Sequence, residues 1–325
     1  MQVGLYFDLR NPARWQQDSA RLHAFTLELC EEADRLGIDS LWFTEHHKFD
    51  DGYLSQPLTF AAAVAARTTR TRIGTAVLVA PLHHPAKLAE EAALVDLISG
   101  GRLDLGLGAG YRVPEYELYG ASMERRYGQT DERVRELRKL WEKGGVTPVP
   151  VQDPIPIWMG YLGPQGAGRA GRLGAGLLTA NSQMWPHYRD ALVIAGHDPS
   201  LGRMAGGIQG LVSEDPDRDW PWVAEHLEYQ VNSYRRHGVE GTGRPTPRPV
   251  DPDRIRANSP QSSLDYFFLE TPEAMAHKVS EYTSGAPVET VYFWASLGGM
   301  SEEAAVRHVH LVCSKLAPLL AEHGN

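Results

Sequence analysis

Cysteine is nearly absent from this sequence, because its 325 residues contain two, Cys30 and Cys313. Two thiols in a chain of this length make no disulfide framework of the kind that small secreted domains use. The N-terminal stretch MQVGLYFDLRNP also lacks the basic region and the long apolar region of a secretory signal. We therefore expect a protein of the reducing cytoplasm.

An excess of positive charge is also missing. Lys and Arg number 32 against 41 Asp and Glu, so the formal net charge is −9. This acidic balance provides no electrostatic footprint for nucleic acid or for an anionic membrane surface. No apolar run approaches the roughly 18 residues that are needed to span a bilayer. These absences predict a soluble protein whose partners include neither nucleic acid nor a membrane.

What the sequence contains is an alternation of strand-like and helix-like segments along almost its whole length. The strands are continuous apolar runs, as expected for parallel strands that are covered on both faces. We expect them at residues 3–9, 40–46, 72–80, 102–108, 155–161, 176–181, 203–212 and 290–296. The intervening helices include those expected at 18–37, 56–69, 84–99, 127–143, 186–195, 220–238 and 301–321. This α/β pattern predicts a (β/α)8 TIM barrel, with residues 1–325 as a single domain.

Residues 239–263, VEGTGRPTPRPVDPDRIRANSPQSS, interrupt this pattern. The segment is rich in Pro, Gly and Arg, so we expect no helix in it. A loop this long inside a compact domain is usually a lid or a disordered segment. The sequence therefore predicts an insertion between strands 7 and 8, with residues 239–263 as a lid loop at the active end of the barrel. An extra helix is expected after it, at 271–283.

The second predicted strand ends in Glu45, His46 and His47, and functional residues of TIM barrels gather at such strand ends. Because side chains alternate along a strand, Glu45 and His47 share one side while His46 points to the other. Three interpretations stay open on the residues alone: a metal site, a polar rim held by hydrogen bonds, or an acid/base histidine. Adjacent strand residues converge poorly on one metal ion, whereas a histidine has the intrinsic pKa for proton transfer near neutrality.

Glycine-rich stretches follow two other strands. Residues 166–171 contain a G-x-G-x-x-G pattern after the fifth strand, where exposed backbone N–H groups would suit a phosphate. Its position after four β–α units is unlike that of a dinucleotide-binding fold. Gly106, Gly108 and Gly110 alternate at the end of the fourth strand. They indicate either a tight corner of the barrel or a place where a flat ligand approaches the backbone.

Three stretches together resemble the bacterial luciferase-like flavin-dependent monooxygenases: ADRLGIDSLWFTEHH, RIGTAVLVAPLHHPAKLAEEAALVDLISGGRLDLGLGAGY and PIWMGYLGPQGAGRAGRLGAG. The resemblance extends from the N-terminus to about residue 181 and resumes at TPEAM and the last helix. The family uses a TIM barrel that takes reduced FMN from a separate flavin reductase and reacts it with O2. The resemblance implies the same partners here, and oxygenation of a small organic substrate through a C4a-peroxyflavin. An aldehyde, a ketone or another electrophilic centre is the expected target.

Carried onto this chain, the resemblance makes His46 the active-site histidine beside the flavin ring, with Glu45 and His47 supporting it. Ala76-Val77 falls on the dipeptide that forms a non-proline cis bond under the flavin in relatives. The implied cofactor-binding residues are Ala76, Val77, Gly108, Leu162, Gly163 and Gly166, and no metal ligand is implied. Relatives often carry Ser, Thr or Glu in the phosphate loop, so backbone N–H groups would hold the phosphate here. Gly108 falls where luciferase has a reactive cysteine, and light emission is not expected.

The same superfamily includes enzymes that use the deazaflavin F420, which usually carry an Asp-His type motif at the second strand. Glu45-His46-His47 is more similar to the FMN branch, so we predict an FMN-dependent monooxygenase. An F420-dependent hydride-transfer oxidoreductase, a non-catalytic flavin-binding protein and a metal-dependent hydrolase are the alternatives. The apolar helices at 56–69 and 84–99 imply a homodimer, because these helices form the dimer interface in the family.

Overall fold

The computed structural model describes residues 1–142, 144–258 and 266–322. Its strands are Gln2–Phe7 (β1), Ser40–Phe43 (β2), Arg72–Thr75 (β3), Leu78–Val79 (β4), Leu103–Gly108 (β5), Ile157–Met159 (β6), Gly176–Leu178 (β7), Met204–Ile208 (β8), Gly210–Val212 (β9), Phe268–Glu270 (β10) and Val288–Trp294 (β11). Its longer helices are Ser19–Leu36 (α1), Pro57–Arg67 (α2), Pro85–Ser99 (α3), Arg126–Trp141 (α5), Gly163–Arg172 (α6), Trp185–Ile194 (α7), Pro216–His237 (α8), Pro272–Thr283 (α10) and Glu302–Leu311 (α11). The shorter ones are Val113–Tyr119 (α4), Pro252–Ala257 (α9) and Ala317–Glu322 (α12).

The strands close into a parallel barrel, which confirms the predicted (β/α)8 class. Pairing runs from β3 through β2, β1, β11, β8, β7 and β6 to β5, and β5 pairs with both β3 and β4, which closes the ring. β3 and β4 occupy one position in the ring, so the barrel has eight strand positions. β1 is central to the register, because Leu5 is paired with Leu41 of β2 on one side and with Phe293 of β11 on the other.

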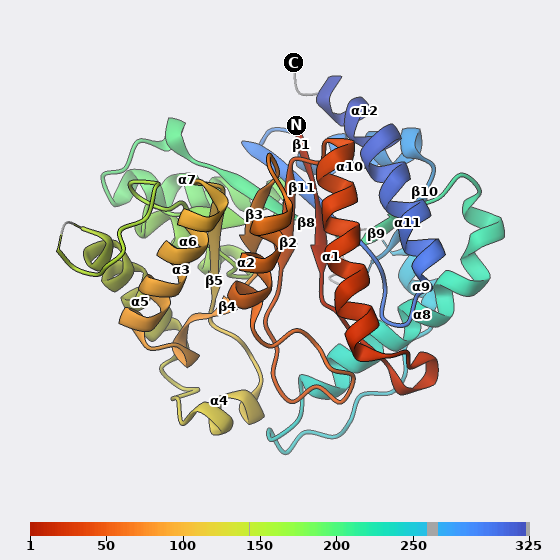
Figure 1. Ribbon diagram of the computed structural model, residues 1–325, viewed down its shortest axis with the longest axis horizontal. Helices are drawn as coiled ribbons and strands as arrows, with labels where there is room; N and C mark the ends of the chain where they lie inside the picture. Colours follow the sequence, from red (N-terminus) through yellow and green to blue (C-terminus); the bar gives the residue numbers. More distant parts are fainter. Residues whose placement is uncertain (143, 259–265, 323–325) are drawn as a thin grey trace.

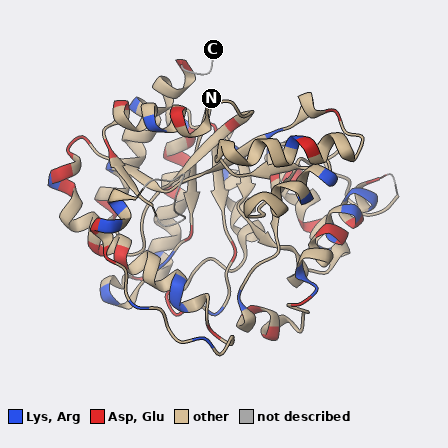
Figure 2. Ribbon diagram, turned by 180° about the vertical axis from the view of Figure 1, so that it is seen from behind, with Lys and Arg blue, Asp and Glu red and all other residues tan. Residues whose placement is uncertain are grey.

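Helices surround the barrel and leave its two ends different (Figure 1). The N-terminus and α12 lie at one end, whereas α4, the loop after β2 and the end of α8 lie at the other, where the strands finish. Figure 2 shows acidic and basic residues interspersed, mostly on the helices and loops around the strands. Crossing a membrane would require a longer and more apolar helix than any in the described residues.

Local sequence accounts for several of these boundaries. Asp18 caps α1, since its Oδ1 accepts a hydrogen bond from the N–H of Arg21 at 2.7 Å. Gly37 ends the same helix at φ 94°, a left-handed conformation that glycine adopts without steric cost. Both residue types are typical of these helix ends.

Two predicted strands are interrupted. The third, 72–80, divides into β3 and β4 around Ala76 and Val77. The seventh, 203–212, divides into β8, which stays in the barrel, and β9, which pairs with β10 in a separate two-stranded sheet. Both predicted runs therefore do contain strand residues, but the prediction that each run forms a single strand is wrong. The final helix, expected at 301–321, is also divided, because a π-helical stretch joins α11 to α12.

The segment predicted as a helix-free lid loop contains α9, so that part of the prediction is wrong. Pro252 occupies the first turn of α9, and the side chain of Asp251 caps it by accepting from the N–H of Asp253 at 3.0 Å. These three residues form a start signal that the overall Pro, Gly and Arg content obscured. Residues 259–263 of the segment lie outside the described residues. The insertion between the seventh and eighth barrel strands contains β9, α8, α9, β10 and α10.

Candidate active site

The three residues that follow β2 are all buried where the barrel strands end. Glu45, His46 and His47 are 1%, 7% and 4% exposed. The strand ends at Phe43, and the N–H of His46 donates a hydrogen bond to the carbonyl of Leu54 at 3.0 Å. This bond folds the loop after β2 back over the strand end and holds the three residues in place.

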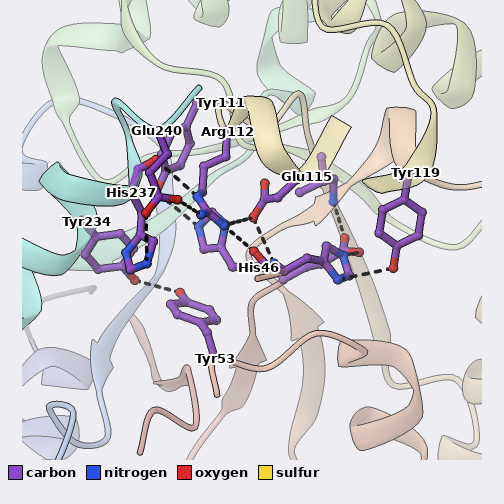
Figure 3. A network of polar contacts seen from close by, with 12 residues as sticks. His46, Tyr53, Tyr111, Arg112, Glu115, Tyr119, Tyr234, His237 and Glu240 are labelled. Carbon is purple, nitrogen blue, oxygen red and sulfur yellow. Dashed lines mark hydrogen bonds and ion pairs between the residues drawn. The ribbon is translucent and has the colours of Figure 1, made fainter. Parts of the chain in front are cut away.

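The imidazole of His46 has a different partner at each nitrogen (Figure 3). Nδ1 lies 2.8 Å from Oε1 of Glu115, and Nε2 lies 3.4 Å from the hydroxyl of Tyr111. A carboxylate accepts hydrogen bonds, so it keeps the proton of a neutral imidazole on Nδ1. The lone pair of Nε2 then faces Tyr111 as a hydrogen-bond and proton acceptor.

Burial sets the protonation state of this pair. Burial lowers the pKa of His46 below its usual value, and the facing Glu115 carboxylate opposes that shift without reversing it. Burial alone would raise the pKa of Glu115, but hydrogen bonds from His46 and from the N–H of His47, with the charge of Arg112, lower it. At neutral pH the site therefore holds a neutral imidazole beside an ionised carboxylate.

Arg112 joins this pair to the segment after α8. Its guanidinium is fully buried and donates to Glu115 at 3.3 Å, to Glu240 at 2.5 Å and to the carbonyl oxygen of His47. It also lies over the ring of Phe49, 4.3 Å from the ring centre. Glu240 belongs to the segment predicted as a lid, so the beginning of that segment is tied to the site by an ion pair (Figure 3).

Glu45 and His47 form a second buried cluster with His83. Oε1 of Glu45 lies 2.8 Å from Nε2 of His47 and 2.8 Å from Nε2 of His83, and its Oε2 accepts from the N–H of Val79 at 2.6 Å. Burial alone would raise the pKa of Glu45, but these hydrogen bonds lower it. The imidazoles of His46 and His47 thus bind different carboxylates, although the backbone N–H of His47 also donates to Glu115. Within the described residues, no group of three or more His, Cys, Asp or Glu is arranged to hold a metal ion.

A cavity of about 340 Å³ opens beside these residues. The predicted site residues that line it are Glu45, His46, Ala76, Val77, Gly108 and Leu162. The tyrosines that line it, none of which was predicted, are Tyr6, Tyr53, Tyr111, Tyr127, Tyr161, Tyr234 and Tyr292. His47, Gly163 and Gly166 are the predicted residues outside the lining, and the two glycines lie in the first turn of α6, directly after Leu162.

The peptide bond between Ala76 and Val77 is cis, as the resemblance implied. The Val77 side chain lies between two glycines: a Cβ on Gly108 would come within 2.5 Å of its Cγ2, and one on Gly160 within 2.4 Å of its Cγ1. A Cβ on Gly106 would likewise meet backbone of β3 at 1.8 Å. These glycines make room for the adjoining strand, which favours the tight-corner interpretation over clearance for a flat ligand.

The G-x-G-x-x-G pattern lies inside α6 and not before it. A Cβ on Gly166 would come within 2.6 Å of the Cβ of Tyr161, and one on Gly171 within 2.6 Å of the carbonyl oxygen of Tyr188 on α7. Both glycines therefore serve close packing, and the pattern as a whole is not an exposed phosphate cradle. The start of α6 remains available, because its N-cap residue Leu162 makes no side-chain hydrogen bond to the first turn.

Positive charge lies near this end of the cavity. The guanidinium carbons of Arg126 and Arg169 are 4.6 Å and 5.4 Å from the ring centre of Tyr127, which lines the cavity. Arg169 is paired with Asp131 at 2.5 Å, whereas Nε of Arg126 is buried and has no hydrogen-bond partner among the described residues. Cationic side chains beside a helix N-terminus suit an anionic group such as a phosphate.

Sequence reasoning missed Glu115 and Arg112, which lie between the predicted strand at 102–108 and the predicted helix at 127–143. The available signal was Val113-Pro114-Glu115, a proline and then an acid in a first helical turn, which is typical of a helix start. Nothing in the linear order indicates that this acid faces a histidine 69 residues away.

Comparisons with known proteins concern the sequence as a whole and the fold. The sequence profile described as luciferase-like monooxygenase matches residues 1–287. The chain is 35% identical over 167 residues to the oxygenase component of a flavin-dependent trigonelline monooxygenase from Acinetobacter baylyi, which covers 46% of each protein. It is 29% identical over 212 residues to an F420-dependent glucose-6-phosphate dehydrogenase from Amycolatopsis mediterranei, which covers 59% of this chain and 62% of that protein. Each of these matches spans less than two thirds of the relative's own length.

Solved structures extend the similarity across nearly the whole chain. A monooxygenase from Streptomyces bottropensis has a TM-score of 0.80 at 25% identity and covers 98% of this chain and 99% of that one. The FMN-bound oxygenating constituent of 3,6-diketocamphane monooxygenase from Pseudomonas putida has a TM-score of 0.76 at 19% identity, with 98% of both chains covered. An F420-dependent secondary alcohol dehydrogenase has a TM-score of 0.72 at 21% identity, also with 98% of both covered. The last two likenesses concern the fold alone.

Proposed function

The chain belongs to the luciferase-like monooxygenase family, and from this premise we propose that it is a flavin-dependent monooxygenase that uses reduced FMN and O2 to oxygenate a small organic substrate. The observation that carries the proposal is the arrangement of His46. Its neutral imidazole is oriented by Glu115 and lies in the same cavity as the cis peptide of Ala76–Val77. A proton acceptor in a cavity lined by short side chains and aromatic rings suits chemistry on a flat redox ring.

The residues around the cavity fit FMN in shape and in charge. The short side chains of Ala76 and Val77 line one wall of the cavity, against which a flat ring can lie. Gly163 and Gln165 at the start of α6 offer backbone N–H groups to a phosphate, and the half-buried Arg126, whose Nε has no hydrogen-bond partner among the described residues, adds positive charge nearby. When bound, reduced FMN supplies the electrons that activate O2 for transfer of an oxygen atom to the substrate.

His46 is the residue that we assign to proton transfer. Because Nδ1 donates to Glu115, Nε2 can accept a proton from a substrate or cofactor atom in the cavity and return it. Glu115 is a positioning residue, since it acts through the imidazole. Glu45 and His47 support the strand end from its other side, where His83 binds the same carboxylate. This division of roles follows from the two separate carboxylates.

An F420-dependent oxidoreductase is the second candidate, because curated relatives include proteins named F420-dependent glucose-6-phosphate dehydrogenase. The neutral Nε2 of His46 would also suit removal of a proton from an alcohol. Against a sugar phosphate as the substrate, no Lys or Arg is found among the described residues that line the cavity. This absence weighs against a sugar phosphate inside the cavity, and the Glu45-His46-His47 motif keeps the monooxygenase as the first candidate.

We also propose a separate flavin reductase as a partner, because the trigonelline monooxygenase relative is named an oxygenase component. A homodimer is supported by an apolar surface on α3, where Leu94, Leu97 and Ile98 are 52%, 40% and 43% exposed. Val149 and Val151 are exposed beside it, since the N–H of Val151 donates to Asp96 of α3. An apolar surface of this kind usually marks a contact with another chain.

Anaerobic titration of the purified protein with reduced FMN and with reduced F420 tests the proposal. We expect reduced FMN to bind more tightly, and admission of O2 to reoxidise it at a rate that changes in His46→Ala. His84→Ala is the matched control, because His84 is exposed and lies outside the cavity. Binding of F420 alone would replace the first candidate by the second. Binding of FMN with reoxidation unaffected by His46→Ala would indicate a non-catalytic flavin-binding protein.

A further inference from the structure

Three tyrosine hydroxyls form a chain on the wall of the cavity. The hydroxyl of Tyr53 lies 3.2 Å from that of Tyr6 and 2.7 Å from that of Tyr234. Tyr6 is on β1, Tyr53 is in the loop after β2, and Tyr234 is on α8, so the tertiary fold alone brings them together. All three line the cavity with His46 (Figure 3 shows Tyr53 and Tyr234 beside it).

The three linked hydroxyls carry one hydrogen more than the hydrogen bonds between them require. Three phenols carry three hydroxyl hydrogens, and the two hydrogen bonds that connect them use two. The phenols stay protonated, because burial raises the pKa of Tyr6 and raises those of Tyr53 and Tyr234 well above the ordinary value. The remaining hydrogen is therefore a neutral donor on the cavity wall.

The charges around the chain disfavour an anion. Arg10 lies behind the wall, with its guanidinium carbon 5.0 Å from the ring centre of Tyr234 and 5.3 Å from that of Tyr53. Its charge is already matched by Asp51 at 2.7 Å, and both side chains are buried. The Asp8 carboxylate also lies close enough to act on the hydroxyls of Tyr53 and Tyr234. A substrate anion would meet one neutral donor and no unpaired cation.

The ring of His46 is close to the rings of both Tyr53 and Tyr234, whose hydroxyls form the shorter of the two hydrogen bonds. Its centre lies 4.8 Å from that of Tyr53 and 6.2 Å from that of Tyr234. A small molecule whose oxygen accepts from either hydroxyl would therefore contact the imidazole with its neighbouring atoms. Aromatic rings make up the wall around it, which favours an apolar body.

From this arrangement we propose that the Tyr53–Tyr234 hydroxyl pair determines substrate specificity: it binds the carbonyl or hydroxyl oxygen of an uncharged, largely apolar molecule and discriminates against carboxylates and phosphates. The proposal deepens the proposed function and rests on it for the reaction that follows. The binding of the oxygen atom does not depend on the proposed function, because both hydroxyls are side chains of the protein and need no flavin.

Binding of three probes of similar size tests the inference: acetophenone, which has a neutral oxygen acceptor, ethylbenzene, which has none, and benzoate, which is an anion. NMR titration gives the affinities, and isotope-edited infrared spectroscopy of acetophenone labelled at its carbonyl reports hydrogen bonding directly. We expect acetophenone to bind most tightly and its carbonyl stretch to move to lower frequency. Tyr53→Phe and Tyr234→Phe keep the rings and remove one donor each, so acetophenone should bind about threefold to tenfold more weakly.

Tyr292→Phe is the matched control, because its ring lines the same cavity while its hydroxyl is outside the chain. It should leave the carbonyl frequency unchanged. The inference is overturned if both chain variants bind acetophenone with the parent's affinity and frequency, if benzoate binds as tightly as acetophenone, or if acetophenone does not bind.

The probe measurements need neither flavin nor turnover, so the two proposals fail separately. Reduced FMN is titrated into the same proteins. A parent that binds acetophenone through Tyr53 and Tyr234 but binds no flavin refutes the proposed function and supports the donor site. A parent that binds flavin but holds acetophenone independently of both tyrosines refutes the donor site alone.

Discussion

Replacement of Glu115 tests how the candidate site is held together. Its Oε1 accepts hydrogen bonds from Nδ1 of His46 at 2.8 Å, from the N–H of His47 at 3.0 Å and from Arg112 at 3.3 Å. Glu115→Ala leaves these buried donors without that acceptor, and breaking a buried charged pair costs about 3–5 kcal/mol. Arg112 keeps Glu240 and two carbonyls, so we expect the lower part of that range. At about 2 °C per kcal/mol in a chain of this size, Tm falls by roughly 6 °C.

Glu115→Gln separates charge from hydrogen bonding. The amide keeps one oxygen acceptor, and a hydrogen bond to a neutral group is weaker than one to a charged group by about 1 kcal/mol, so we expect a loss of roughly 1–2 kcal/mol. The carboxylate charge opposes the effect of burial on His46, so its removal lowers the pKa of the imidazole further. Nitrogen NMR of labelled histidine follows both the tautomer and this titration, and thermal denaturation follows stability.

Glu117→Ala is the matched control, because Glu117 is exposed on the same helix. Surface substitutions of this kind change stability by about 0.5 kcal/mol or less. If Glu115→Ala lowered Tm no more than Glu117→Ala, or if the His46 tautomer were the same in both Glu115 variants and the parent, the reasoning that Glu115 orients His46 would be refuted.

Three further predictions follow from burial, packing and titration. Gly108→Ala would place a Cβ 2.5 Å from the side chain of Val77, so denaturant unfolding should show that the free energy of unfolding falls by about 1–3 kcal/mol. Gly128→Ala is the control, because a Cβ there meets open space in α5, and it should raise the free energy of unfolding by about 0.5–1 kcal/mol. Ile98→Asp on α3 should yield monomers in light scattering, whereas Ile194→Asp on α7 should leave a dimer; a parent that is already monomeric contradicts the proposed interface. Because burial lowers the pKa of His46 from 6.5, the stability contributed by its neutral form is present above the unfolded-state pKa and is lost as pH falls through the lower folded pKa. Turnover should share that acid limit, and an acid midpoint above 6.5 would contradict this assignment.

The barrel was predictable because each β–α unit carries its own local signals. Asp18 and Gly37 directly flank α1, so the signals for both of its ends lie next to the helix in the sequence. Continuous apolar runs such as SLWF form strands that are buried on both faces. The errors came from the same local reasoning: the run at 203–212 is uniformly strand-like, and only its pairing shows that it leaves the barrel at Gln209.

By itself, the sequence determined the fold class and the family, and it predicted a candidate site at Glu45-His46-His47, because strand period, caps and this motif are all encoded within short segments. The tertiary structure alone decided the partners. It pairs the imidazole of His46 with Glu115 and that of His47 with Glu45. It also brings tyrosine hydroxyls from β1, the loop after β2 and α8 within hydrogen-bond distance of one another. Hydrogen bonds of this kind depend on distances across the barrel mouth, and those distances are fixed by how whole elements pack and not by the neighbours of a residue in the chain.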